Sequence, residues 1–206
     1  MESGQANWTG QERGTMKIKF RQTVLVDMDG VIADFEGAFC DAFGYENREL
    51  ASLTARYPQV PSDLIEEFVN TPSNYADLLP IFGGAVLLPS VLKQRGYYVV
   101  ILTSRPKHLA EVTKEWLEGY SIEYNEIWYA PNKGIAIQEF NTMYPGRRGF
   151  LLIDDIVSNF NGLPESVQGV AWAQPWNEGY FPSMRYNDER MRLEVKTDTV
   201  SDWAKF

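Results

Sequence analysis

Two aspartates one residue apart, Asp27 and Asp29, follow a short apolar run at 24–26. The run, Val-Leu-Val, is typical of a strand that is buried on both faces. Gly30 comes next and lets the backbone turn sharply without a Cβ clash. At such a strand end one carboxylate can attack a phosphorus atom, and a second can donate and then remove a proton. Because unpaired buried carboxylates are costly, the pair also favours a bound cation.

Three more expected strand ends carry polar side chains. The runs at 97–102, 127–129 and 149–153 are followed by Thr103 with Ser104, by Lys133, and by Asp154 with Asp155. The carboxyl ends of parallel strands share one rim of a sheet, so these side chains are expected to gather around the first two aspartates. A hydroxyl and an ammonium can hold phosphoryl oxygens as charge spreads, and a further acid completes an oxygen-rich Mg²⁺ site. This set is what phosphoryl transfer through a metal needs.

Strand-like and helix-like patterns alternate along the chain after this first motif. We expect strands at 17–26, 97–102, 127–129, 149–153 and 170–173, and helices at 31–43, 84–94, 107–118 and 134–140. The alternation predicts an α/β fold with a mostly parallel central sheet, right-handed crossovers and helices on both faces. The segment 200–206 is expected to form a short closing helix whose Trp203 packs on the body of the protein.

A second, smaller unit is expected between the first strand and the helix at 84–94. About 50 residues separate these elements, which is too many for a simple crossover. The segment 36–82 carries helical patterns broken by prolines, and we interpret it as a small helical cap over the carboxyl end of the sheet. Helices packed beside the sheet are the alternative. The core domain is then formed by 17–35 and 83–206, and the polar stretch 1–16 is expected to be a disordered lead-in.

Composition limits the expected partners. Of the 206 residues 44% are hydrophobic, which is ample for the core of one domain, and the net charge is −9. The negative charge argues against general binding to nucleic acid polymers or membrane surfaces, although local cations and a metal can still bind a small anion. Cys40 is the only cysteine, so no internal disulfide forms, which fits a cytoplasmic protein. The sequence contains no run of 18 apolar residues, so no membrane span is expected. The oligomeric state stays open, and a homodimer is one of the possibilities.

The segment 23–35, TVLVDMDGVIADF, resembles the first motif of the haloacid dehalogenase (HAD) superfamily, DxDG[VT]. The longer DMDGVIADFE is most similar to the 5'(3')-deoxyribonucleotidases of that superfamily. The four polar strand ends, in this order, resemble the four motifs of the superfamily and extend the resemblance over about 23–159. The resemblance implies a Rossmann-like HAD core, Mg²⁺ as cofactor and an aspartyl-phosphate intermediate.

The resemblance also implies a role for each matched position. Asp27 matches the nucleophile and Asp29 the general acid/base, whose backbone carbonyl would also bind Mg²⁺. Thr103 matches the hydroxyl that binds phosphate, and Lys133 matches the lysine that neutralises phosphate and nucleophile. Asp155 matches the carboxylate that binds Mg²⁺ together with Asp27.

The choice between the two adjacent acids depends on spacing. The superfamily often shows an Asp or Asn four residues after the metal-binding acid, and Asn159 stands at that distance from Asp155. We therefore favour Asp155 as the metal ligand and place Asp154 behind it. Capping of a following helix is the alternative role for both acids.

Aromatic and cationic residues point to a nucleotide. The segment 74–85 resembles the stretch with which the deoxyribonucleotidases leave their cap. Phe35 matches an aromatic that packs on the base in that family, and Tyr75 falls near another, with core packing as the alternative for both. Ser104 and Lys114 fall near family positions that bind phosphate or its surroundings.

Arg105 departs from the family pattern, because we expect Thr-Ser-Pro in the second motif. It either reaches the substrate or is exposed. His108, the only histidine, is expected on the surface.

These features predict a Mg²⁺-dependent phosphatase of nucleoside monophosphates, with deoxyribonucleotides as the expected substrates. Asp29 favours phosphate ester hydrolysis over carbon–halogen chemistry, since the resemblance implies that dehalogenases generally lack this second acid. Two alternatives stay open. One is a HAD phosphatase for another small phosphorylated metabolite, and the other is a phosphate-binding regulator without turnover.

Overall fold

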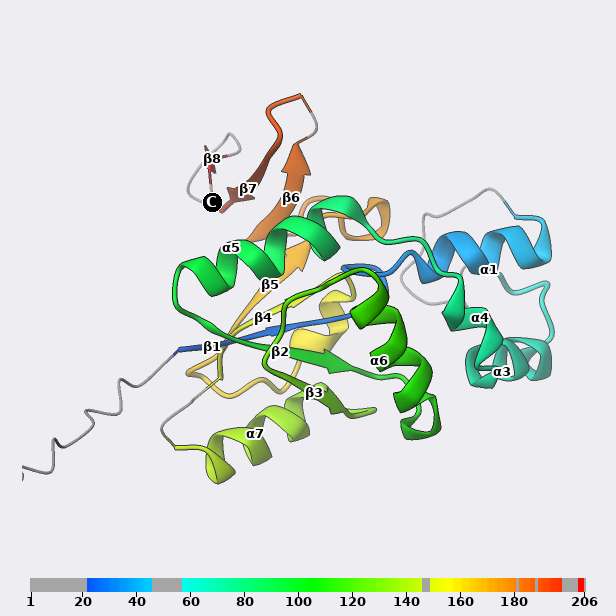
Figure 1. Cartoon of the computed structure of the whole chain (residues 1–206), viewed down its shortest axis with the longest axis horizontal. Helices are drawn as coiled ribbons and strands as arrows, with labels where there is room; N and C mark the ends of the chain where they lie inside the picture. The colour runs from blue at the N-terminus through cyan, green and yellow to red at the C-terminus, as the bar shows by residue number, and fades with distance from the viewer. Residues whose placement is uncertain are drawn as a thin grey trace, which may run out of the picture.

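The computed structural model describes residues 22–45, 57–145, 149–180, 182–187, 189–197 and 204–205. An eight-stranded sheet, in the order β3-β2-β1-β4-β5-β6-β7-β8, forms the centre of this described part (Figure 1). The strands are β1 (Thr23–Val26), β2 (Tyr98–Thr103), β3 (Glu126–Tyr129), β4 (Gly149–Asp154), β5 (Gln168–Trp172), β6 (Ser183–Asn187), β7 (Arg192–Lys196) and β8 (Ala204–Lys205).

The first six strands pair in parallel, and β7 and β8 are added in antiparallel pairing. The chain passes from β1 to β2 on one side and returns to β4 on the other, so the strand order reverses beside β1. In open α/β sheets this reversal opens a crevice at the carboxyl ends of the strands. The predicted α/β fold with a mostly parallel sheet is confirmed.

Helices cover both faces of the sheet. On one face α5 (Leu88–Gln94) and α6 (Ala110–Gly119) pack on the alternate side chains Val24, Val26, Val99 and Ile101. On the other face α7 (Lys133–Met143) packs on Leu25, Val100, Leu102 and Leu152. Because successive side chains of a strand point to opposite faces, the apolar runs of β1 and β2 supply both halves of the core.

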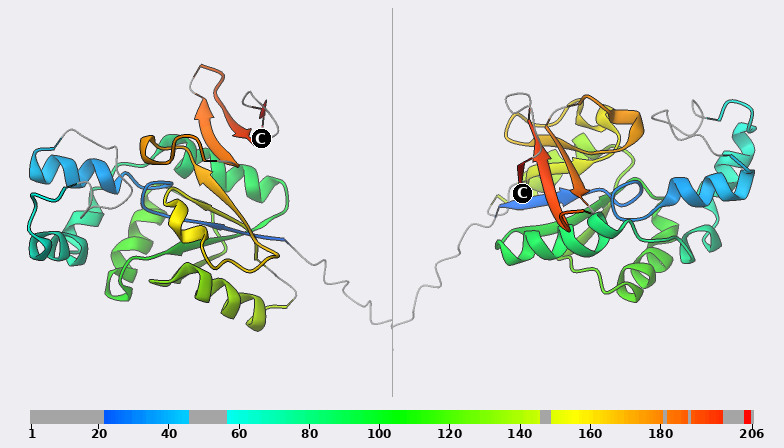
Figure 2. Two further views of the ribbon diagram at one scale, coloured as in Figure 1. Left: turned by 180° about the vertical axis from the view of Figure 1, so that it is seen from behind. Right: turned by 90° about the horizontal axis from the view of Figure 1, so that it is seen from above.

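Three further helices lie beyond the carboxyl end of β1 (Figures 1 and 2). They are α1 (Phe35–Phe43), α3 (Ser62–Asn70) and α4 (Ser73–Ala76). Of these helices, α1 and α3 supply a separate hydrophobic cluster that contains Phe39, Cys40, Tyr57 and Phe68, whereas Tyr75 of α4 belongs to the main core. The thiol of Cys40 is buried there and lies 2.9 Å from the Tyr57 hydroxyl. The predicted division of the chain into a cap and a core stays a prediction.

Two elements differ from the expected ones near the first motif. The helix expected at 31–43 begins at Phe35, because the carbonyl of Met28 accepts from the N–H groups of Ile32 and Ala33, both at 2.8 Å, in a turn. Asp34 then caps the helix by accepting from the Gly37 N–H at 2.9 Å. The helix expected at 84–94 begins as a π-helical turn, Gly83–Leu87, in which a Cβ on Gly84 would lie 1.6 Å from the Val31 carbonyl. Glycine is therefore required where this turn crosses the first motif.

The tail of the chain also differs. The strands β6 and β7 form a hairpin that was not expected, and residues 204–205 pair with β7 as a strand. The helix predicted at 200–206 is therefore wrong at those two residues, and Trp203 lies outside the described residues. Part of the first expected strand, 17–21, lies outside them as well. No helix among the described residues is both long and apolar enough to cross a membrane.

Candidate active site

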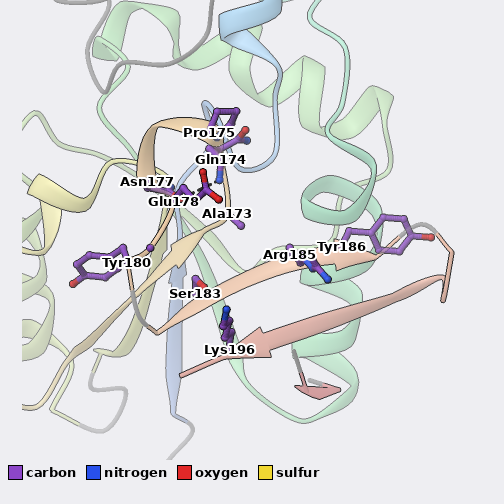
Figure 3. Close-up of a pocket in the computed structure, with 11 residues that line it drawn as sticks. Ala173, Gln174, Pro175, Asn177, Glu178, Tyr180, Ser183, Arg185, Tyr186 and Lys196 are labelled. Atoms are coloured by element: carbon purple, nitrogen blue, oxygen red, sulfur yellow. Dashed lines mark hydrogen bonds between the residues drawn. The ribbon is translucent and has the colours of Figure 1, made fainter. Parts of the chain in front are cut away.

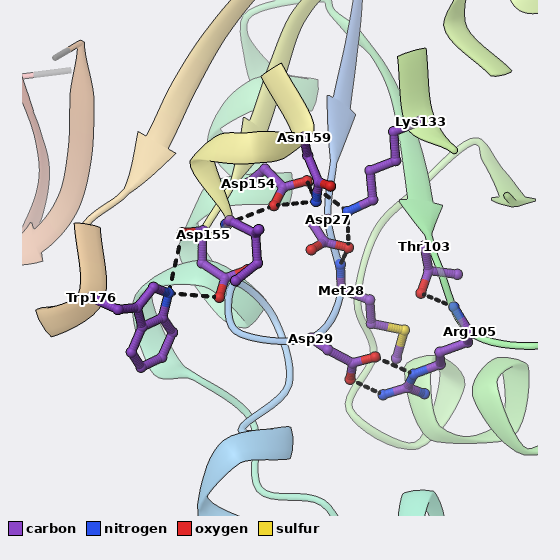
Figure 4. Close-up of polar contacts among 11 residues, drawn as sticks. Asp27, Met28, Asp29, Thr103, Arg105, Lys133, Asp154, Asp155, Asn159 and Trp176 are labelled. Carbon is purple, nitrogen blue, oxygen red and sulfur yellow. Dashed lines mark hydrogen bonds and ion pairs between the residues drawn. The ribbon is translucent and has the colours of Figure 1, made fainter. Parts of the chain in front are cut away.

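Three strand ends and the start of α7 meet at one rim of the sheet (Figure 4). Lys133 is the first residue of α7, and its ammonium lies 2.6 Å from Asp27 Oδ1 and 2.6 Å from Asp154 Oδ2. The side chain of Lys133 is 2% exposed. Burial alone would lower the pKa of Lys133, but the two carboxylates outweigh it and raise the pKa above its usual range. The lysine is thus a fixed positive charge between two buried acids.

Asp27 follows β1 directly and is 6% exposed. Its Oδ1 accepts from the N–H of Met28 at 2.7 Å. Burial raises the pKa of Asp27 to about 7, the charge of Asp154 adds to the rise, and Lys133 opposes it. More positive charge near this carboxyl would keep it ionised at neutral pH, which a nucleophile requires.

The adjacent acids at the end of β4 have different surroundings. Asp154 accepts hydrogen bonds from the Lys133 ammonium, the Ile156 N–H and the Asn159 side-chain amide. The spacing of Asn159 was used to select Asp155 as the metal ligand, but the Asn159 amide donates to Asp154. Asp155 accepts from the Trp176 indole N–H at 3.1 Å through Oδ2, and its Oδ1 is buried without a hydrogen bond from any described residue.

These carboxylates fit a hard divalent cation. Asp27, Asp154 and Asp155 each offer an oxygen within 4.8 Å of the others. Burial and the charges of Asp27 and Asp154 raise the pKa of Asp155 well above its usual range. A buried oxygen without a donor, among like charges, is stabilised by a cation with oxygen ligands. Because Asp154 already has its donors, we favour Asp27 and Asp155 as the side chains that would hold the metal. This assignment and the carbonyl contribution of Asp29 both stay predictions.

Gly30 allows this approach of β1 and β4. Its φ is +85°, and a Cβ there would lie 2.4 Å from Asp155 Oδ2. The Gln174 side-chain amide donates to the Gly30 carbonyl at 2.8 Å and fixes the turn from the other side. A residue with a side chain would both strain this backbone and displace the carboxylate.

Asp29 lies across the rim from Asp155 and forms a bidentate ion pair. Arg105 Nε donates to Asp29 Oδ2 at 2.9 Å, and Nη2 donates to Asp29 Oδ1 at 2.6 Å. The Arg105 side chain is 1% exposed, whereas that of Asp29 is 27% exposed. Of the two roles expected for Arg105, exposure to solvent is therefore wrong. Thr103, fully buried at the end of β2, accepts from the Arg105 N–H at 3.2 Å through its hydroxyl.

The predicted substrate-binding residues are only partly brought together. Phe35 is half-buried and stacks on Tyr75, with ring centroids 5.3 Å apart. Tyr75 is 2% exposed and donates from its hydroxyl to the Val69 carbonyl at 2.7 Å, so the structure gives it the packing role and not a face for a base. Ser104 is exposed beside the rim. Lys114 is exposed on α6 and lies 3.6 Å from Glu118, so the structure does not bring it to Asp27.

His108 is exposed, as expected, and its Nε2 lies 3.0 Å from the Asn70 carbonyl.

The sequence matches no protein-family model and no curated protein. Solved structures with a similar arrangement include a dehalogenase, with 13% identity over 78% of this chain and 87% of its own and a TM-score of 0.51. A haloacid dehalogenase-like hydrolase from Streptococcus pneumoniae shares 15% identity over 74% of this chain and 85% of its own, with a TM-score of 0.50. The fold is that of the HAD-superfamily hydrolases. The chain spans about half, 52%, of a protein in the Pnkp1/Rnl/Hen1 complex, with 17% identity over 84% of this chain and a TM-score of 0.44.

One part of this HAD fold that sequence reasoning missed is the loop after β5. Trp176 donates to the Asp155 carboxylate, and the Asn177 side-chain amide donates at 2.8 Å to the carbonyls of both Asp155 and Trp172. The loop thereby fixes the backbone and the side chain of the expected metal ligand. Its position directly after the fifth expected strand was the only signal in the sequence.

A cavity of about 550 Å³ lies between this loop and the β6–β7 hairpin (Figure 3). Its lining includes Gln174 and Asn177, the two side chains that bond the backbone of Gly30 and Asp155. On the hairpin side it is lined by Ser183, Arg185 and Lys196. Small-molecule sites of proteins have volumes of about 300–1,000 Å³, and this cavity falls within that range. None of the four aspartates of the rim lines it, so the cavity is connected to the rim only through the contacts of Gln174 and Asn177.

Proposed function

We propose that the chain is a phosphomonoesterase that uses Mg²⁺ and works through an aspartyl-phosphate on Asp27. The observation that carries the proposal is the placement of the Lys133 ammonium 2.6 Å from Asp27, next to a buried Asp155 oxygen that lacks a donor among the described residues. A nucleophile, a fixed cation and a free metal-binding oxygen thus share one small volume. Phosphoryl transfer needs little beyond such positioning and charge.

The residues divide the reaction between them. The Asp27 oxygen attacks phosphorus while Asp29 donates a proton to the departing alkoxide, so the phosphorus–oxygen bond to the alcohol breaks. Asp29 then removes a proton from water, which attacks the acyl phosphate and restores the Asp27 carboxylate with release of inorganic phosphate. Lys133 and the Thr103 hydroxyl hold phosphoryl oxygens. A divalent cation held by Asp27, Asp155 and the Asp29 carbonyl would supply positive charge to the same oxygens.

We propose nucleoside monophosphates as substrates, with deoxyribonucleotides first among them. Support comes from the resemblance of 23–35 and 74–85 to the deoxyribonucleotidases and from Phe35, whose half-buried ring lies at the first turn of α1. Aromatic faces stack on any base, so the ring gives affinity with little base selection. Cys40 is the only cysteine and is a free thiol, which fits the cytoplasmic localisation that we propose.

Phosphate release from a panel of nucleoside and sugar monophosphates, with Mg²⁺ and with a chelator, tests the proposal. We expect Mg²⁺-dependent release that is abolished by Asp27→Asn and slowed by at least ~100-fold by Asp29→Asn, the usual scale of general acid–base help. Asp63→Asn, an exposed carboxylate in α3, is the matched control and should keep full activity. Turnover of sugar phosphates alone would reject the substrate class.

A beryllofluoride titration separates the enzyme from a regulator without turnover. Beryllofluoride mimics the phosphoryl group of an aspartyl-phosphate, so it should form an adduct on Asp27 of the wild type and not on the Asn variant. Absence of both an adduct and phosphate release would reject the enzyme.

A further inference from the structure

Asp29 and Arg105 form a bidentate ion pair at the rim (Figure 4). Two parallel hydrogen bonds fix both the position and the plane of a carboxylate, which a single point charge does not. Each carboxylate oxygen keeps a second lone-pair direction, and the Asp29 side chain is 27% exposed. The carboxylate is thus clamped on one side and open on the other.

The guanidinium itself is not available to a substrate. Each of its three nitrogens donates to the protein, since Nη1 bonds the Thr113 hydroxyl at 3.2 Å in addition to the two contacts with Asp29. The side chain is 1% exposed, and its centre lies 4.4 Å from the centroid of the Tyr75 ring. These contacts use three of the five N–H groups of the guanidinium, and the burial of the side chain keeps the other two from the open site.

The surroundings of Arg105 are also rigid. Its N–H bonds the Thr103 hydroxyl, and Pro106 restricts the backbone before it to extended conformations. The ring of Tyr75 contacts both Arg105 and Phe35, so the guanidinium is packed against α4 as well as α6. Arg105 is suited to fix a neighbouring group, because both its backbone and its guanidinium are themselves held by contacts with the protein.

We propose that Arg105 is a positioning residue that fixes the Asp29 carboxyl for proton transfer to the leaving oxygen. The inference rests on the proposed function and deepens it. It replaces the expectation that Arg105 binds substrate. A carboxyl that rotates freely, or is displaced by about 1 Å, loses on the order of 100-fold in rate when its proton transfer matters.

Leaving-group dependence tests the proposal. An alkyl phosphate, such as the best nucleotide of the panel, needs a proton on its leaving oxygen, whereas p-nitrophenyl phosphate releases a stable phenolate. The parameter is kcat/KM, because it reports the steps up to departure of the leaving group. Arg105→Gln should lower kcat/KM for the nucleotide by about 100-fold and leave that for p-nitrophenyl phosphate nearly unchanged. Arg105→Lys keeps the charge without the fork and should retain only part of the nucleotide activity.

A double-mutant cycle with Asp29→Asn gives the second measurement. If Arg105 acts through Asp29, then Arg105→Gln should cause no further loss in the Asn background. Equal losses for both substrates would show a phosphate clamp and overturn the proposal, as would independent losses in the cycle. A gain in kcat/KM on Arg105→Gln would overturn it too, since the arginine would then hold the acid away from the substrate.

Controls keep the result interpretable. Arg95→Gln, an exposed arginine at the end of α5, should leave both substrates unaffected. If thermal unfolding shows that Arg105→Gln is not folded, Thr113→Val removes one acceptor of the guanidinium without a change in shape and should give a smaller loss confined to the nucleotide. If the wild type turns over neither substrate, the proposed function fails and takes this inference with it, whereas turnover with equal losses overturns the inference alone.

Discussion

Ionisation of Asp27 should destabilise the metal-free protein. The carboxyl is 6% exposed, and burial raises its pKa from an ordinary value of 3.8 to about 7. Between these pH values the folded chain keeps a proton that the unfolded chain has released, so the free energy of unfolding falls as pH rises. The fall begins near the lower value and is complete above the higher one. A difference of this size corresponds to about 4 kcal/mol.

Urea unfolding of the wild type and of Asp27→Asn, followed by tryptophan fluorescence in the presence of a chelator, measures this effect. The variant is neutral at position 27 at every pH. The stability of the wild type relative to the variant should therefore fall, on the order of 4 kcal/mol, between about pH 4 and pH 8. The charge of Asp27 also raises the pKa of Asp155, so the fall reports the two acids together. Lys133 adds no slope, because its pKa stays above its usual range despite its burial.

An unchanged stability difference between the two proteins over this pH range would refute the reasoning, and so would a wild type that gains stability relative to the variant as pH rises. Either result would mean that Lys133 and the Met28 N–H stabilise the Asp27 charge fully without a metal. The control is Asp63→Asn, because this exposed acid should leave the wild-type slope intact.

The expected metal ligand, the turn beside it and the acid of the hairpin give three further tests. Mg²⁺ should raise the unfolding temperature of the wild type in calorimetry and not that of Asp155→Asn, which lacks the buried oxygen that would bind it. Gly30→Ala should lower the free energy of unfolding in urea by more than about 1 kcal/mol, because φ is +85° and the new Cβ would meet Asp155. Burial alone would raise the pKa of Glu194, but hydrogen bonds from Asn187 and three arginines lower it to about 2. Its contribution to stability is therefore present above about pH 4.5 and lost towards pH 2, and Glu194→Gln should flatten that part of an acid unfolding curve.

The convergence of Asp27, Lys133 and Asp155 could be predicted because it needs only local patterns and one rule of topology. Each residue follows a short apolar run, and the ends of parallel strands lie on one rim. The same reasoning gave the order of strands and helices up to β5. The observed start of α1 differs from the expected one, because the Met28 carbonyl accepts hydrogen bonds in a turn that precedes the helix.

The hairpin β6–β7 could have been predicted from the pattern of its residues. Met184 and Tyr186, and Leu193 and Val195, alternate with polar residues at period two, which is typical of strands with one covered face. The two-residue strand β8 carries no such signal, because only its pairing with β7 defines it.

The ion pair of Arg105 could not have been predicted from sequence. Its acceptor Asp29 lies 76 residues earlier, and a basic residue after a strand is usually solvated. The same holds for Trp176, whose contact with Asp155 requires β5 to lie beside β4. Long-range polar contacts of this kind depend on the finished fold and leave no mark in local periodicity.

Asp154 and Asp155 show how neighbours of one type come to differ. They are adjacent at the end of β4, where successive side chains point to opposite sides. Asp154 accepts hydrogen bonds from Lys133 and Asn159 through its carboxylate. The carboxylate of Asp155 accepts one side-chain hydrogen bond, from the indole N–H of Trp176. Identity and spacing can propose a metal ligand, but the number of donors around each oxygen decides which acid still needs a cation. By that criterion a cation is needed most at Asp155, whose buried Oδ1 has no donor among the described residues.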